Sequence, residues 1–422
     1  MTPALKRFSS YAAAIACLAA FFSPSETSFA FDLPLHGFVQ GNYSANTQEA
    51  NPDGKNFKWA EERVQLKLGL SQENCEFFIK QDFFHDSVDT VLRGETREAY
   101  AGYSGTGFDL RAGRQIFTWG TGDLLFINDV FPKDYAAFFS GRPLEYMKKG
   151  VDSLKAGLYA GEISFEVVVI PFFEPNNYPT AKRFHIFDPM ASVTNRHTNE
   201  PSSTFENTEI ALRAYGNLFD YDASLYVYKG FHRSPSFLPD SMPVPAKLTV
   251  FYPRMNSYGA SLQGRALDGV LNVEAGYYDS RDDGNGSNPM IPNSEARFLL
   301  GYQRQMWEDF TASFQYYSEY MLDYSEYKNT LPAGFPKRDR VHTLVTARLT
   351  QFLKYQTVRL SLFSFYSPSD EDYSVIPEIK YNLSDSVWLA AGYNIFGGKK
   401  ETTQFGQFSK DDNLYGQMRY EF

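Results

Sequence analysis

The sequence is poor in cysteine and histidine and has no long apolar segment outside its N-terminus. It contains 2 cysteines and 6 histidines in 422 residues. Only Cys75 lies beyond residue 30, so an internal disulfide is excluded from that part of the chain. No run of about 18 apolar residues follows residue 30, which excludes a membrane-spanning helix there. With 40 basic and 50 acidic residues, a nucleic-acid binder that works through bulk positive charge is excluded as well.

Aromatic residues and glycine are abundant instead. The chain has 29 tyrosines, 38 phenylalanines and 30 glycines, and 43% of its residues are hydrophobic. This composition is too apolar for a disordered chain and lacks the glycine period of collagen. A β-rich membrane protein is compatible with it, because the apolar residues of a membrane-spanning strand alternate with polar ones.

The first thirty residues have the features of an export signal. The basic pair Lys6-Arg7 precedes an apolar stretch over residues 11–22 that is too short to span a bilayer. Ser28-Phe29-Ala30 then forms a small-x-small cleavage site. We therefore expect a signal peptide over residues 1–30 and a mature domain over residues 31–422.

From residue 57 onward, stretches of about ten residues alternate apolar and polar side chains. In one of them Val64, Leu66 and Leu68 alternate with Arg63, Gln65 and Lys67. A period of two is expected when one face of a strand meets a low-dielectric phase and the other meets water. Many such strands in series, with no helical segment between them, predict a single large sheet.

The connections between these strands alternate in length. Short polar turns are predicted near 72–74, 105–107, 160–161, 217–220, 266–269, 307–309, 352–355 and 383–386. Longer polar segments are predicted near 46–56, 86–94, 119–149, 174–202, 233–250, 282–294, 323–339, 368–371 and 398–410. Eight short and nine long connections join eighteen strands and place both chain ends on the short-turn side. Short periplasmic turns and long extracellular loops are typical of transmembrane antiparallel β-barrels, so we predict this all-β fold rather than a soluble β-sandwich.

The last strand has apolar residues at alternate positions and ends in an aromatic residue. Met418, Tyr420 and Phe422 fall on one face, and Phe422 is the final residue. This pattern resembles the C-terminal signal of Gram-negative outer-membrane barrels, which the barrel-assembly machinery recognises. The resemblance implies export through the periplasm to the outer membrane, with lipid and lipopolysaccharide around the barrel.

Charged residues are predicted to line the barrel interior. The inward positions include Glu61, Lys67, Lys80, Asp82, Glu98, Arg111, Glu166, Glu209, Arg213, Arg265, Glu274, Arg297, Arg348, Arg359, Glu378, Lys380 and Arg419. An Arg or Lys that faces lipid at mid-bilayer costs about 2–4 kcal/mol, so this many charges require a polar lumen. A barrel of this width encloses an aqueous channel unless something folds inside it.

The third long loop, residues 119–149, is the segment expected to narrow that channel. It carries more aromatic and aliphatic residues than an exposed loop needs, which predicts that it folds into the barrel. Its candidate constriction residues are Asp123, Asp129, Lys133, Asp134 and Arg142. The candidate residues on the facing wall are Lys80, Arg97, Arg111 and Arg348. A loop that only lids the barrel or packs against a neighbouring subunit is the alternative.

A short motif around this loop resembles porin-like families of Gram-negative bacteria, including the alginate-export-like group. The matching residues are Gly113-Arg114-Gln115, Trp119-Gly120, Asp123, Asn128-Asp129 and Phe131-Pro132. The resemblance implies an outer-membrane channel whose loop after the fifth strand enters the pore. Strict alternation would turn Arg114 towards lipid; a bulge at Gly113 would re-aim it inward, and a rim position would let its long side chain reach the polar boundary.

The function expected from these features is passive diffusion of small hydrophilic solutes or ions through a porin. The charges of the loop balance, so no ion preference is predicted. A substrate-specific channel or exporter for an oligosaccharide or polysaccharide is one alternative, and a non-conducting structural or adhesin barrel is another. We expect no enzyme activity, cofactor, metal site or nucleic-acid partner; whether the chain forms a homo-oligomer stays open.

Overall fold

The computed structural model describes residues 34–422, so the predicted signal peptide lies outside the described residues. Eighteen strands form one sheet. They are β1 (Leu35–Asn46), β2 (Phe57–Gln72), β3 (Cys75–Asp86), β4 (Val91–Gly105), β5 (Phe108–Gln115), β6 (Val151–Ala160), β7 (Ile163–Ile170), β9 (Glu209–Leu218), β10 (Tyr221–Phe231), β13 (Arg254–Ala266), β14 (Gly269–Ser280), β15 (Glu295–Trp307), β16 (Phe310–Met321), β17 (Val341–Leu353), β18 (Val358–Ser367), β19 (Asp372–Asn382), β20 (Val387–Gly398) and β21 (Asn413–Glu421).

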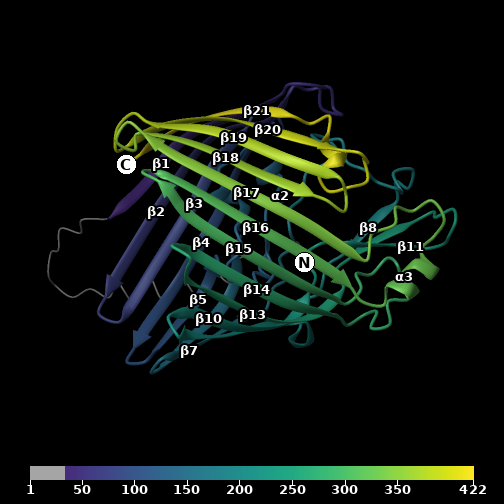
Figure 1. The fold of residues 1–422 in the computed structure, drawn as a ribbon, viewed down its shortest axis with the longest axis horizontal. Helices are drawn as coiled ribbons and strands as arrows, with labels where there is room; N and C mark the ends of the chain where they lie inside the picture. Colours follow the sequence, from purple (N-terminus) through teal and green to yellow (C-terminus); the bar gives the residue numbers. More distant parts are fainter. Residues whose placement is uncertain (1–33) are drawn as a thin grey trace.

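The sheet is a closed antiparallel barrel. Each strand pairs with the next along the chain, and β1 pairs with β21, so that Gly37 N donates to Phe422 O at 2.9 Å and the first and last strands meet. The predicted number of strands is confirmed. Most of the predicted short turns and longer loops are found as well, but the connections β3–β4 (residues 87–90) and β18–β19 (residues 368–371) are no longer than the turn β17–β18 (residues 354–357). Figure 1 shows β8 (Arg196–Asn199), β11 (Ser236–Pro239) and α3 (Tyr324–Thr330) gathered beyond one end of the barrel, opposite the end at which the chain terminates.

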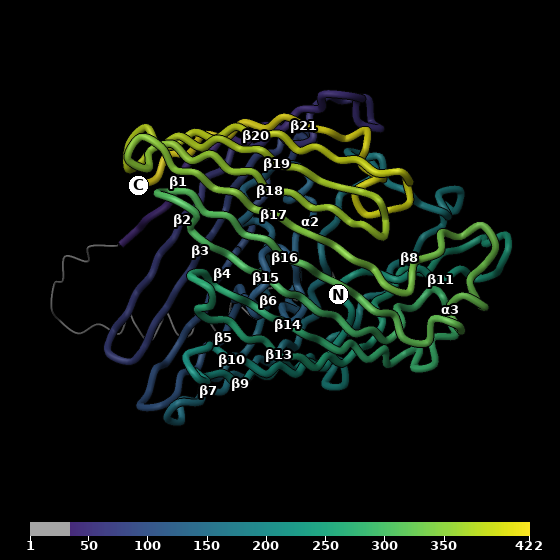
Figure 2. The backbone as a smooth tube through the Cα atoms, viewed as in Figure 1, coloured from purple at the N-terminus to yellow at the C-terminus, as the bar shows by residue number. Residues whose placement is uncertain are grey.

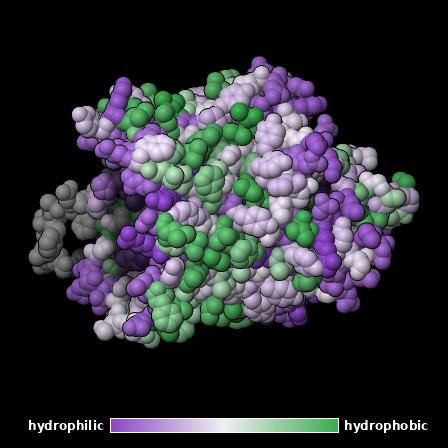
Figure 3. All heavy atoms as spheres, in the orientation of Figure 1, coloured by the Kyte–Doolittle hydropathy of each residue, from purple (hydrophilic) through white to green (hydrophobic). Residues whose placement is uncertain are grey.

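The alternating pattern of each strand separates the two faces of the barrel. In β2, the side chains of Arg63 and Gln65 point inward and are buried, whereas Val64 points outward and is 37% exposed. Figure 3 shows apolar side chains over the middle of the barrel and polar ones over the loop end. Within the described residues, no helix is long and apolar enough to cross a membrane.

The long loops contain the remaining elements. The strands β8 (Arg196–Asn199), β11 (Ser236–Pro239) and β12 (Leu248–Phe251) form a second, three-stranded sheet. The short helix α3 (Tyr324–Thr330) lies in another loop. The backbone trace in Figure 2 follows these loops away from the strands and shows the helix α2 (Tyr135–Phe139) within the outline of the barrel.

The main apolar cluster lies inside the barrel and is built around the segment between β5 and β6, residues 116–150, called loop 3 below. Loop 3 includes the helix α2 (Tyr135–Phe139) and the 3-10 turn η1 (Leu144–Met147). Its buried members of the cluster are Phe117, Trp119, Leu125, Ile127, Val130, Phe131, Phe138, Phe139 and Met147. Their wall partners include Leu299 on β15, Phe365 on β18 and Phe396 on β20. The predicted entry of this loop into the barrel therefore has a direct physical cause, the burial of its apolar side chains.

Candidate pore and the loop inside it

Loop 3 reaches from its own strands to walls all around the barrel. Trp119 Nε1 donates to Glu166 on β7 at 2.8 Å, and the ring of Phe138 lies 5.5 Å from that of Phe365 on β18. Further along, Asn413 Nδ2 on β21 donates to the carbonyl of Phe139 at 3.1 Å. Contacts with β7, β18 and β21 hold the loop across the lumen rather than against one side of it.

A single carboxylate on β14 holds the first part of loop 3. Glu274 Oε2 accepts hydrogen bonds from the backbone N–H of Thr121 at 2.8 Å and of Gly122 at 3.2 Å. Its Oε1 accepts from the backbone N–H of Asn128 at 2.7 Å and from the Asn128 side-chain amide at 3.0 Å. The side chain is 1% exposed, so these bonds satisfy a charge that would otherwise be buried unpaired.

Two glycines on the inner wall allow this close approach. A Cβ placed on Gly259 of β13 would lie 1.7 Å from Oδ1 of Asn128. A Cβ on Gly276 of β14 would lie 2.6 Å from Cγ2 of Ile127. A side chain at either position would force Asn128 or Ile127 of the loop to shift away from the wall.

The five predicted constriction residues take different places. Asp123 forms an ion pair of 2.6 Å with Arg348 on β17. The sequence pattern predicts the first of these residues on the loop and the second on the facing wall. Asp134 caps α2 by accepting from Ala137 N at 3.1 Å. Arg142 lies near Glu61 on β2 at 3.6 Å and near Asp134 at 3.4 Å.

Asp129 and Lys133 stabilise the loop itself. Both side chains are buried, and Lys133 Nζ donates to Asp129 Oδ1 at 2.8 Å and to the carbonyl of Phe131 at 2.7 Å. Burial lowers the pKa of Lys133, and the neighbouring Asp129 raises it in part. These two charges therefore pair with each other inside loop 3.

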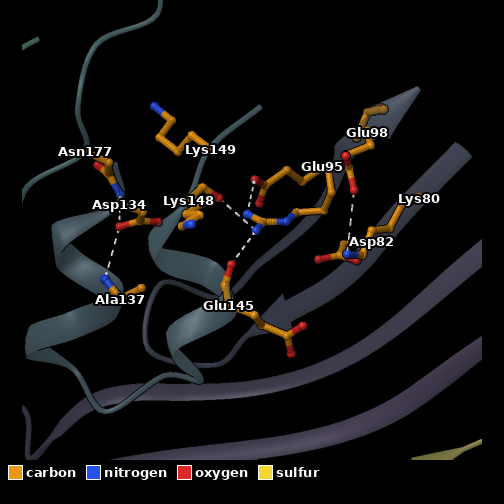
Figure 4. A network of polar contacts seen from close by, with 12 residues as sticks. Lys80, Asp82, Glu95, Glu98, Asp134, Ala137, Glu145, Lys148, Lys149 and Asn177 are labelled. Carbon is orange, nitrogen blue, oxygen red and sulfur yellow. Dashed lines mark hydrogen bonds and ion pairs between the residues drawn. The ribbon is translucent and has the colours of Figure 1, made fainter. Parts of the chain in front are cut away.

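The other predicted wall residues have two kinds of partner, carboxylates of the wall and carbonyl groups of the loop. Lys80 lies 3.8 Å from Glu98, and Arg111 lies 2.6 Å from Glu76, so both have carboxylate partners on the wall. Arg97 is the extra residue of a bulge in β4, and it donates to the carbonyls of Glu145 and Lys148 at 2.9 Å each. Figure 4 shows these two loop residues beside Lys80, Glu95 and Glu98 of the wall.

Of the two arrangements considered for Arg114, the bulge at Gly113 is not found; the irregularity lies in the neighbouring strand β4, at Arg97. The pairing of β5 with β4 and β6 is continuous, so Arg114 keeps the outward register of Leu110. Arg114 Nε donates to Thr96 O at 2.9 Å, and its guanidinium lies 3.7 Å from Asp152. The long side chain of Arg114 therefore reaches hydrogen-bonding and acidic partners although the residue faces outward.

Loop 3 leaves a cavity of 480 Å³ on the side of β17 to β21. Its charged lining residues are the cations Arg142, Arg348, Arg359, Lys380 and Arg419 and the acids Glu145 and Glu378. Its aromatic lining residues are Phe138, Phe352, Phe363, Trp388 and Tyr415. A smaller cavity of 170 Å³, lined by residues such as Lys155, Glu166 and Arg213, lies on the side of β4 to β9.

Most cations of the larger cavity have acidic partners, but Lys380 does not. Arg359 lies 2.6 Å from Glu378, and Arg419 forms an ion pair with Glu145. Among the described residues, no carboxylate oxygen lies within 4.0 Å of Lys380 Nζ, which instead sits 4.0 Å from the centre of the Trp388 ring. Alternation predicted that Lys380, Arg359, Glu378 and Arg419 face inward, but not that loop 3 leaves space beside them.

The described residues 34–422 contain no cluster of potential metal ligands. No group of three or more His, Cys, Asp or Glu side chains there is placed to hold a metal ion. In the acidic loop after β14, Asp283 accepts hydrogen bonds from the backbone N–H of Ser287 at 3.1 Å and of Asn288 at 2.7 Å. The carboxylate therefore shapes its own turn.

Comparison with solved structures identifies the fold. OccK2 (OpdF) of Pseudomonas aeruginosa, solved in complex with glucuronate, matches with a TM-score of 0.57 at 9% identity, covering 94% of this chain and 99% of that one. OccD3 (OpdP) of the same species matches with a TM-score of 0.55 at 10% identity, covering 94% and 92%. OccK11 (OpdR) matches with a TM-score of 0.53 at 9% identity, covering 92% and 95%.

No family model matches the sequence, and no curated protein matches it by sequence. Three structural features therefore define the fold: eighteen antiparallel strands, a closed seam between β1 and β21, and a long loop inside the barrel. A closed barrel leaves no unpaired strand edge. A protein that crosses lipid with β-strands requires this, because lipid offers no hydrogen-bond partners to the backbone. The chain has the fold of the outer-membrane porins of Gram-negative bacteria.

Proposed function

We propose that the protein is an outer-membrane channel for small hydrophilic solutes, with a preference for anions of the size of a sugar acid. The observation that carries this proposal is the unpaired cation Lys380 in a lumen cavity lined by five cations and two acids. A solute carboxylate supplies the partner that Lys380 lacks. That OccK2, which shares the fold, was solved with glucuronate supports this class of solute.

Transport through such a site needs no chemical reaction. A solute exchanges part of its hydration shell for the polar wall, and binding must be weak enough for release. In the larger cavity, Lys380 and the neighbouring Arg359 attract the carboxylate, while Trp388 and Tyr415 offer flat faces to a ring. We propose Asp123, Arg142 and Arg348, with the rest of residues 119–149, as the constriction that the solute passes.

The proposed location and assembly follow from the outer face. Met418 and Tyr420 point outward on β21 and, with Phe422, are about half exposed. Their exposure supports the proposal that this segment is the assembly signal, which the assembly machinery and then lipid would contact. Outer-membrane lipid and lipopolysaccharide are the proposed surroundings of the outward-facing apolar side chains.

The test is the ion preference of single channels in a planar bilayer. In a salt gradient, the mature protein should show a reversal potential that indicates anion preference, and Lys380→Gln should reduce it. The matched control is Lys155→Gln, because Lys155 lines the other cavity and already lies 3.4 Å from Asp109 and 3.5 Å from Glu166. Glucuronate should block the current of the wild type more strongly than that of Lys380→Gln.

Three results would count against the proposal. Cation preference in the wild type would contradict the role of the larger cavity, and equal effects of the two substitutions would contradict the role of Lys380. An absence of current would favour a closed barrel, an alternative supported by the contacts of loop 3 with walls on several sides.

A further inference from the structure

Residues 140–146 of loop 3, called the strap below, run between two apolar anchors. On one side, the ring of Phe139 lies 4.4 Å from that of Phe408 and 5.6 Å from that of Phe396. On the other side, Met147 is buried in the same apolar cluster. Within the strap, Tyr146 packs against Phe38 of β1, in a small apolar cluster that is separate from the main one.

The strap covers polar groups of β1 without bonding to them. Gln40 and Asn42 point into the barrel and are 1% and 0% exposed. The Nε2 atom of Gln40 and both amide atoms of Asn42 have no hydrogen-bond partner within the described residues, and neither does the hydroxyl of Tyr146 on the strap. Each buried polar atom without a partner destabilises the state that buries it, and water would satisfy all of them.

The neighbouring strand holds the strap in the opposite way. Asn42 is the register partner of Gln417 on β21, and both side chains face inward. Gln417 Nε2 donates to the carbonyl of Gly141 at 2.9 Å. Arg419 on the same strand pairs with Glu145. β21 therefore stabilises the seated strap, together with Arg97 of β4 and Glu61 of β2, whereas β1 is left with unmet hydrogen bonds.

From this asymmetry we propose that the strap is a gate that lifts away from β1 while Phe139 and Met147 stay anchored. Lifting hydrates Gln40 and Asn42 and enlarges the larger cavity, which Gly141 to Glu145 line in the seated state. The long side chains of Arg419 and Gln417 can follow the strap over a short displacement. This gate rests on the channel function proposed above and describes how that channel opens.

The test compares substitutions of Asn42 and Gln417, two amide side chains at paired positions of β1 and β21. A thiol introduced by Ser140→Cys, in a Cys75→Ser background, reports on the strap because Ser140 is 1% exposed when the strap is seated. With the folded full-length mature protein, Asn42→Leu should slow labelling of this thiol by about tenfold, because it removes the unmet hydrogen bonds of the seated state. Gln417→Met should accelerate labelling by about tenfold, because it removes the bond to Gly141.

Two controls separate the gate from general stability and from conduction. A thiol at Ser257, buried on β13 away from the strap, should be labelled at one rate in all backgrounds. Open dwell times in single-channel recordings should shorten in Asn42→Leu and lengthen in Gln417→Met. If Asn42→Leu does not fold, Asn42→Ala replaces it with the same expected direction.

The outcomes are distinguishable from failure of the channel function. Opposite shifts in labelling without any current would support the moving strap and overturn the proposed channel. Current with equal or same-direction labelling shifts in the two variants would overturn the gate and leave the channel in place. Faster labelling in Asn42→Leu would also overturn the gate.

Discussion

Replacing Glu274 should release the first part of loop 3 from the wall of β14. The carboxylate accepts five hydrogen bonds from Thr121, Gly122 and Asn128 at distances of 2.7–3.3 Å. In Glu274→Gln one of the two oxygens becomes an N–H₂ donor, which faces backbone donors and can accept none of their bonds. About half of the attachment is therefore lost.

The size of the effect follows from the kind of bond. A hydrogen bond to a charged group contributes about 1.5–3 kcal/mol, so losing two weakens the attachment by about 3–6 kcal/mol. A neutral amide is easier to bury than a carboxylate, which offsets part of this loss. We expect a net weakening of at least about 2 kcal/mol, which shifts the ratio of displaced to seated loop by about thirtyfold.

Two measurements check this prediction. Amide hydrogen exchange over residues 121–128 should accelerate by about the same factor, and single-channel conductance should rise or become noisier. Glu295→Gln is the matched control, because Glu295 is also buried on the inner wall but pairs with Arg297 rather than with the loop. Unchanged exchange and conductance in Glu274→Gln, or an equal change in Glu295→Gln, would refute the reasoning.

Two further predictions concern the seating and the charge of the loop. Gly259→Ala should also raise the conductance, since its Cβ would lie 1.7 Å from Asn128 Oδ1. Gly416→Ala, whose Cβ would have nothing within 4 Å on the outer face, should leave the conductance unchanged. Asp123→Asn should increase anion preference in a salt gradient, because it removes the acidic partner of Arg348. A shift towards cation preference in Asp123→Asn would contradict the assignment of this pair to the pore.

Local patterns in the sequence were sufficient for the barrel itself. The inward and outward faces of a strand follow from a period of two, so the alternation of Arg63, Val64 and Gln65 predicts their burial without knowledge of the neighbouring strands. Turn residues and loop lengths mark where each strand ends, which predicted the number of strands and the closure of β1 on β21. Apolar residues within residues 119–149 likewise predicted that this loop leaves the surface.

Only the tertiary structure decided which charges remain available in the lumen. Ionic pairing depends on distances across the barrel, which strand tilt and loop path set and which no local pattern contains. Asp129 and Lys133 thus pair inside loop 3. Arg97, at a bulge in β4, donates to carbonyl groups of the loop. Lys380 lies 4.0 Å from the centre of the Trp388 ring, and no carboxylate oxygen of the described residues lies within 4.0 Å of its Nζ. The sequence alone determined that the interior is charged, and the folded loop determined where a solute would meet that charge.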